Sequence, residues 1–218
     1  RSNFGLGEVY KTNLINKLLC LLANKYSSLD PFGVGIEMEA NKPNWFDSLN
    51  GLPALFGSSS CETFELKRLC LIIKVLLEKS ARNKIDVTEE INELLLGLDG
   101  LTKQYFNSNS ENKDYIFWDE SHNLKEEYRR KTQLGLSGKE SESDVKQLLG
   151  ILEGFLAKID LGLNKAFDNK TKTYYGYFIN EVKDYQAKPS NSIWPNKFTQ
   201  IRVPLFLEWS ASGVIARR

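Results

Sequence analysis

The sequence contains few of the residues on which familiar catalytic and metal chemistry depends. It has a single histidine, His122, among 218 residues. One histidine excludes a metal site built from several histidines, and it excludes a Ser-His-Asp triad unless His122 itself serves. Because His122 lies among charged and polar residues in the segment 119–123, we interpret it as a residue of an exposed helix face.

Cysteine is scarce as well. The chain has Cys20, Cys61 and Cys70, an odd number that is too small for a disulfide scaffold. None of them forms a Cys-x-x-Cys pair, so no zinc site and no other metal site is expected. Three unpaired thiols favour a reducing compartment over secretion.

Long apolar runs are missing too. The most apolar stretch, residues 69–77, is interrupted by Lys74 and is much shorter than the roughly 20 residues that span a bilayer. No basic-then-apolar leader follows Arg1. We therefore expect a cytoplasmic protein.

Neither sign of charge is in excess, because 29 Lys and Arg residues stand against 28 Asp and Glu residues. This balance argues against a general electrostatic attraction to nucleic acid or to anionic lipid, so neither is an expected partner. Gly33-Val34-Gly35 lacks the third glycine of a dinucleotide-binding turn, and the chain has no P-loop pattern. No cofactor is expected.

What the sequence does contain is mostly helical periodicity. Apolar residues recur at spacings of three and four, and Ser59-x-x-Glu62 has the pattern of a capping box. The segment 173–182 is instead rich in aromatic and β-branched residues, which predicts a small β element near 172–183. A helical bundle, a solenoid and an α/α toroid all fit this pattern. Helices are predicted over about residues 10–26, 59–78, 86–106, 111–133 and 141–167.

Residues 28–61 interrupt this periodicity with glycine, proline and aromatic residues, and a long segment of that kind is usually functional. A tryptophan offers a flat apolar face to a sugar ring, and a carboxyl group beside aromatic surface has a raised pKa, as a general acid needs. In the sequence, Trp45 lies two residues before Asp47, so Trp45 is the candidate for sugar stacking and Asp47 the candidate for the general acid. The alternative is that Trp45 is a packing residue and Asp47 caps the turn at 48–51. The other polar candidates in the segment are Glu37, Glu39, Lys42 and Asn50.

The run Trp45-Phe46-Asp47-Ser48-Leu49-Asn50, with Gly51, Ser58, Ser59 and Glu62 after it, carries a family resemblance. It resembles the Asp-Trp-Asn-Asp-Gly-Met-Asn motif of glycoside phosphorylases of the cellobiose phosphorylase type. It is still more similar to the Lys-Pro-Gly-Trp-x-Asp-Ala-x-Asn-Gly-Leu-Pro-Gly-Leu-Phe-Gly-Ser run of cellobiose phosphorylase-like proteins. Asn44 departs from both patterns, and the specific match covers about 35 residues.

The resemblance implies an all-α protein with an (α/α)6-barrel catalytic domain. It also implies inverting phosphorolysis of a β-linked gluco-oligosaccharide, which releases a sugar 1-phosphate. Asp47 would be the general acid, and inorganic phosphate, the co-substrate, would be the nucleophile. Trp45 and Asn50 would shape the sugar site, and Glu37 or Glu39 would hold hydroxyl groups or orient Lys42.

Other features limit what this chain is expected to do. A full barrel needs more helices than the chain supplies. The sequence shows no counterpart of the family's phosphate site. Lys67 and Arg68 are the two basic residues that could approach an anion. We therefore expect residues 1–218 to be a single domain that is a fragment of a larger catalytic domain and inactive alone, with a homodimer possible for the full-length protein. An inverting hydrolase or transglycosylase and a non-catalytic carbohydrate-binding fragment are the alternatives.

Overall fold

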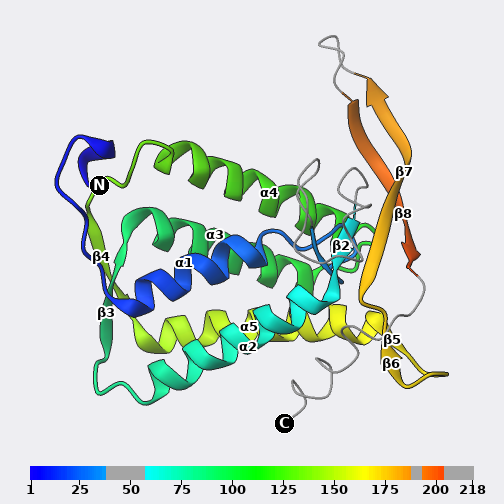
Figure 1. The fold of residues 1–218 in the computed structure, drawn as a ribbon, viewed down its shortest axis with the longest axis horizontal. Helices are drawn as coiled ribbons and strands as arrows, with labels where there is room; N and C mark the ends of the chain where they lie inside the picture. Colours follow the sequence, from blue (N-terminus) through cyan, green and yellow to red (C-terminus); the bar gives the residue numbers. More distant parts are fainter. Residues whose placement is uncertain (38–56, 188–192, 204–218) are drawn as a thin grey trace. The chain divides into compact units, whose positions relative to one another are not determined.

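The computed structural model describes residues 1–37, 57–187 and 193–203, and Figure 1 shows their arrangement as helices and strands. The helices of this described part are α1 (Leu14–Tyr26), α2 (Ser60–Glu78), α3 (Glu89–Asn107), α4 (Lys113–Thr132) and α5 (Val145–Ala166), with a short 3-10 helix at Asn3–Gly5. Its strands are β1 (Ile36–Glu37), β2 (Gly57–Ser59), β3 (Lys84–Thr88), β4 (Glu140–Asp144), β5 (Phe167–Asp168), β6 (Thr173–Tyr174), β7 (Tyr177–Ala187) and β8 (Ile193–Arg202).

The expected all-α fold of the α/α-toroid kind is wrong, because the protein is mixed α/β with a four-stranded antiparallel sheet. The helices lie within a few residues of the predicted ranges. The strands were missed because several are only two or three residues long, which is too short for a periodic pattern. The β element expected near 172–183 is one part of a larger sheet.

The chain forms two compact units. Unit 1 comprises residues 1–28 and 65–160, and unit 2 comprises residues 29–64 and 161–218. Most of α2 and α5 belongs to unit 1, while the first turn of α2 and the last turn of α5 belong to unit 2. The expected single domain over 1–218 stays a prediction.

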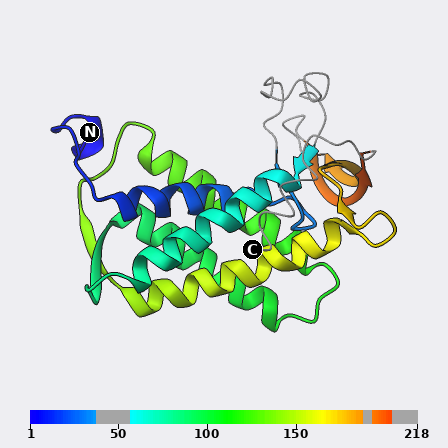
Figure 2. The same ribbon diagram turned by 60° about the horizontal axis from the view of Figure 1, so that its bottom comes forward.

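Unit 1 is a set of helices with a two-stranded ribbon at one end. Strand β3 runs directly into α3 and pairs antiparallel with β4, which runs directly into α5, so the ribbon lies at the start of both helices (Figure 2). Asn13 is the N-cap of α1, and its side chain accepts a hydrogen bond from the Asn16 N–H at 2.8 Å.

The core of unit 1 is centred on Tyr26, which is fully buried at the end of α1. Its ring stacks on Phe155 with centroids 3.8 Å apart and meets the edge of Phe117 at 5.7 Å. Its hydroxyl shares a 2.8 Å hydrogen bond with the Thr102 hydroxyl, which also donates to the Leu98 carbonyl. The aromatic ring therefore joins α1, α3, α4 and α5, and its polar end is satisfied within the core.

Helix α2 exposes one apolar stripe, whose side chains are 39% to 47% exposed. The stripe consists of Leu71, Ile72, Val75 and Leu76.

No helix in the described part of the chain is long and apolar enough to cross a membrane.

Unit 1 also buries a lysine. The side chain of Lys158 is 1% exposed, and its Nζ lies 2.8 Å from Oδ1 of Asp114. The ammonium also lies 4.0 Å from the ring centroid of Tyr105 and 5.0 Å from that of Phe117, within the range of cation–π attraction. Burial, followed by the nearby Asp114 carboxylate, raises the pKa of the Tyr105 hydroxyl. The ion pair joins α4 to α5, and the cation–π contact with Tyr105 adds α3.

We predict that the two partners of this pair respond unequally to removal. Asp114→Ala strands the buried ammonium of Lys158 and should lower the free energy of unfolding by about 3–5 kcal/mol. Lys158→Met should cost less, because the Asp114 side chain is 24% exposed and water can solvate it. Urea unfolding measures both changes. Glu142→Ala, which breaks the exposed Lys84–Glu142 pair, is the control and should have little effect. Equal losses from Asp114→Ala and Glu142→Ala would contradict the interpretation.

Unit 2 is built on an antiparallel sheet of order β1-β2-β7-β8. Ser58 pairs with Phe178, and Asn180 pairs with Gln200. Directly paired residues share a face, and residues two apart on a strand do so as well. The side chains of Ser58, Phe178, Asn180 and Gln200 therefore lie on one face of the sheet.

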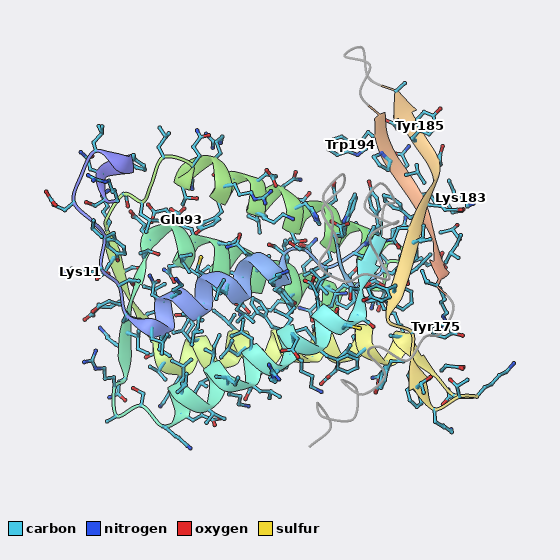
Figure 3. All side chains as sticks on the ribbon, viewed as in Figure 1. Lys11, Glu93, Tyr175, Lys183, Tyr185 and Trp194 are labelled. Carbon is cyan, nitrogen blue, oxygen red and sulfur yellow. The ribbon has the colours of Figure 1, made fainter. Side chains whose placement is uncertain are left out.

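The long β7–β8 hairpin has an interrupted outer edge. Its register shifts between Val182 and Tyr185, and Pro195 in β8 has no N–H to offer to another strand. Both features are typical of edge strands that avoid pairing with a further chain. Figure 3 labels Tyr185 and Trp194 on this hairpin, where they are 56% and 39% exposed.

Candidate functional site

Of the six candidate site residues at 37–50, the structure describes one, Glu37, which is half-buried in β1. Its backbone pairs with that of Ser58 in β2. The other candidates lie outside the described residues, so the structure neither brings them together nor separates them. These are Glu39, Lys42, Trp45, Asp47 and Asn50.

The two ends of the segment that carries these residues lie side by side. The chain leaves the described part after Glu37 and returns at Gly57, on two strands that pair antiparallel. Strand β2 is in turn paired with β7, so both ends belong to the sheet of unit 2. The sheet thereby fixes where residues 38–56 begin and end.

The buried carboxylate of Asp30 is hydrogen-bonded to residues near both ends of this segment. Asp30 is 0% exposed, and five donors converge on its two oxygens. They come from the turn that follows Asp30, from β2 and from β8. The donors, with their distances to the carboxylate, are the backbone N–H groups of Phe32 (3.0 Å), Val34 (2.9 Å) and Gly35 (3.1 Å), the Ser58 hydroxyl (2.5 Å) and the Gln200 side-chain amide (2.9 Å).

The local sequence explains why this turn forms. In Asp30-Pro31-Phe32-Gly33, the proline presets the backbone at the second turn position, and an aspartate at the first can accept from N–H groups further on. The Gly33 N–H donates to the Asp30 carbonyl at 2.8 Å, and Gly33 has a φ of +65°, which favours glycine. The Asp30 N–H then donates to the Gly35 carbonyl at 2.8 Å, which closes the turn.

The last turn of α5 packs tightly against the same turn. A Cβ atom at Gly162 would lie 1.8 Å from the Gly33 carbonyl oxygen, so only glycine permits this approach. Lys165, one helical turn later, donates to the Phe32 carbonyl at 2.7 Å. Val34 in the turn, Ala166 in α5 and Phe178 in β7 form a buried apolar cluster beside the carboxylate. The Asp30 turn is thus held between the sheet and α5.

Burial raises the pKa of Asp30, while the hydrogen bonds from Ser58 and from the backbone of the turn lower it. The N–H groups among the donors cannot accept a proton from a carboxylic acid, so the arrangement is that of an ionised carboxylate. Because the group has no exposed surface, it cannot exchange a proton with a substrate. Asp30 is therefore a positioning residue for the sheet and for the ends of the segment 38–56.

Sequence reasoning missed Asp30, although the Asp-Pro-Phe-Gly turn was a usable signal. Nothing in the sequence indicated Gln200 and Asn180, whose side chains are joined by a 2.9 Å hydrogen bond. Gln200 reaches Asp30, 170 residues earlier in the chain, only because β7 pairs with β2 and β8 pairs with β7.

Tyr177 and Phe178 are each 1% exposed, so the start of β7 is packed inside unit 2. Two further sequence interpretations concern described residues. His122 is half-buried, not fully on the surface, and its Nδ1 lies 2.8 Å from the Trp118 carbonyl oxygen. The two candidate anion-binding residues already have acidic partners at 2.7 Å. Lys67 pairs with Asp160, and Arg68 pairs with Glu65.

Within the described ranges, no group of three or more His, Cys, Asp or Glu side chains is arranged to hold a metal ion. A scan against protein-family models and a search of curated proteins found no match to this chain.

We predict that the charge of Asp30 is needed for the stability of unit 2. Asp30→Asn places an N–H₂ group against the Gly35 N–H and should lower the free energy of unfolding by about 2–4 kcal/mol, as measured in urea. Asp168→Asn is the matched control, because Asp168 also accepts backbone N–H groups in a turn, those of Lys170 and Thr171, but is only partly buried. It should change stability little. A result in which both variants are equally stable would refute the assignment.

Proposed function

We propose that this chain belongs to an enzyme that cleaves a β-linked gluco-oligosaccharide with inorganic phosphate and inversion at the anomeric carbon. The segment 38–56, which carries the motif similar to that of cellobiose phosphorylase-like proteins, is the proposed site. The supporting observation is that both ends of this segment are fixed on paired strands above the Asp30 carboxylate.

The precision that catalysis requires also supports the proposal. A catalytic group must be held within a fraction of an ångström of its productive position, and sites set on strands are more precise than free loops. Gly35 and Ser58, which lie next to the two ends of the segment, both donate to Asp30. The described residues on either side of the segment 38–56 are therefore joined through one carboxylate.

In the proposed mechanism, Asp47 donates a proton to the glycosidic oxygen of the leaving sugar. Phosphate attacks the anomeric carbon from the opposite face, so the carbon–oxygen bond to the leaving sugar breaks as the bond to phosphate forms. Phosphate is itself the nucleophile, and no second carboxylate is needed to activate water, as an inverting hydrolase requires. Trp45 would stack on the sugar ring, and Asn50 would bind its hydroxyl groups.

The remaining polar residues of the segment have supporting roles in this proposal. Glu37 lies in β1 next to the segment, and Glu39 follows two residues later in the sequence. Either would bind sugar hydroxyl groups or orient Lys42. The reaction is proposed to take place in the cytoplasm, by the full-length protein, with a homodimer as its possible assembly.

The proposal predicts that Asp47→Asn lowers turnover of the full-length enzyme by about 10²-fold or more, because general-acid assistance is lost. Sugar 1-phosphate release from a β-linked glucan, with and without phosphate, measures this. Asp184→Asn, an exposed carboxylate in β7, is the control and should leave turnover unchanged.

The product identifies the reaction class. Sugar 1-phosphate that appears only with phosphate supports phosphorolysis, whereas free sugar at the same rate without phosphate assigns a hydrolase. Saturable oligosaccharide binding with no turnover assigns a carbohydrate-binding protein. A loss below tenfold in Asp47→Asn counts against Asp47 as the acid.

A further inference from the structure

The exposed apolar stripe of α2 plays no part in the proposed reaction. Helix α2 lies at one outer side of unit 1 (Figure 1), and the four aliphatic side chains of the stripe are 39% to 47% exposed. The outward face of a surface helix is normally polar, and a contiguous apolar patch on such a face is typical of an interaction surface. The stripe consists of Leu71, Ile72, Val75 and Leu76.

This stripe is the centre of a regular seam along the helix. The positions of the seam are spaced by three, four, three and four residues, which is the spacing at which one helix packs along another in a coiled coil. The seam lies wholly within unit 1 and extends over about 21 Å, at about 1.5 Å per residue. Ile73 and Leu77 on the opposite face are buried, so α2 presents the seam outward. The seam consists of Glu65, Arg68, Ile72, Val75 and Lys79.

The two ends of the seam carry opposite charges. Glu65 occupies the first position and its side chain is 51% exposed, while Lys79 occupies the last position and is exposed as well. Glu65 pairs with Arg68 of its own helix at 2.7 Å, whereas Lys79 has no acidic partner among the residues that the structure describes. The basic end of one seam therefore complements the acidic end of another.

The charges also determine the direction in which two seams fit. If two copies of α2 run antiparallel with Ile72 on Ile72, Glu65 of each copy lies opposite Lys79 of the other, because both residues are seven positions from Ile72. A parallel pair would instead place Glu65 on Glu65 and Lys79 on Lys79, where like charges repel each other. The seam is thus complementary to a second, reversed copy of itself, as a twofold interface requires.

We propose that the seam of α2 is a contact between two copies of this chain, related by a twofold axis at Ile72. Leu71, Val75 and Leu76 of both copies pack around the axis, and an ion pair between Glu65 and Lys79 closes each end. A contact of one helix on one helix is small among specific interfaces, so the dimer forms weakly and reversibly. The surface is separate from the segment 38–56, so the dimer and the proposed reaction are tested independently.

Sedimentation equilibrium of the full chain, over micromolar to millimolar concentrations, tests the proposal. The wild-type protein should show a reversible equilibrium between monomer and dimer. Ile72→Glu should weaken the dimer about tenfold or more, because it brings two carboxylates together at an apolar contact. Ile116→Glu replaces a similarly exposed isoleucine on α4 and should leave the dimer unchanged. A wild-type protein that is monomeric throughout, or equal association of the two variants, would overturn the proposal.

Charge reversal tests the direction of the pair and leaves the apolar stripe intact. Glu65→Lys and Lys79→Glu, each alone, should weaken the dimer several-fold, because each variant places like charges at both ends of the contact. The double variant that combines Glu65→Lys with Lys79→Glu should restore the wild-type affinity. Single variants without effect, or a double variant weaker than either single one, would contradict the antiparallel contact.

Thiol labelling separates a second copy from another segment of the same chain. In Ile72→Cys and Ile116→Cys variants, the rate of reaction with a maleimide measures access to each position. Protection that grows with protein concentration in Ile72→Cys alone supports the dimer. Protection of Ile72→Cys that persists in dilute, monomeric protein would assign the stripe to another segment of the chain and refute the dimer. Fast labelling of both variants at every concentration would refute it as well.

Discussion

The Asp30 carboxylate receives donors from three parts of the chain that are distant in sequence. The turn after Asp30, strand β2 and strand β8 each contribute at least one hydrogen bond to it. A buried charge is costly unless it is well bonded, and removal of its partners exposes that cost in full. The same group that closes a short local turn therefore also requires that β8 pair correctly with β7.

The hydrogen bonds of Asp30 also support the proposal that the segment 38–56 is the functional site. Its two ends lie on β1 and β2, and the residues next to them, Gly35 and Ser58, are bonded to one carboxylate. Gly162 completes the arrangement, because the backbone of α5 comes so close to Gly33 that no side chain fits. Unit 1 is organised differently, around the Tyr26 ring and the Lys158–Asp114 ion pair, where aromatic surface surrounds the polar atoms.

The sequence was informative where the physical signal is local. Spacings of three and four predicted the five helices, and their observed ends lie within a few residues of the predicted ranges. The Asp-Pro-Phe-Gly turn could also have been recognised from its residues alone.

The fold class was wrong because the sheet depends on long-range pairing. Ile36-Glu37 and Gly57-Ser58-Ser59 are too short to show alternation, and they are strands only because β7 offers them a partner. The motif residues around Asp47 rest on resemblance, and the structure contributes the position of the two ends of their segment.

The account depends most on Asp30 as the closing bond of unit 2, and amide hydrogen exchange tests this directly. If the carboxylate holds the turn, the N–H protons of Val34 and Gly35 should exchange as slowly as those of the β2–β7 pair, because all of them open only when unit 2 unfolds. Rapid exchange of these two amides, at the rate of an exposed turn, would show that the carboxylate does not hold the turn.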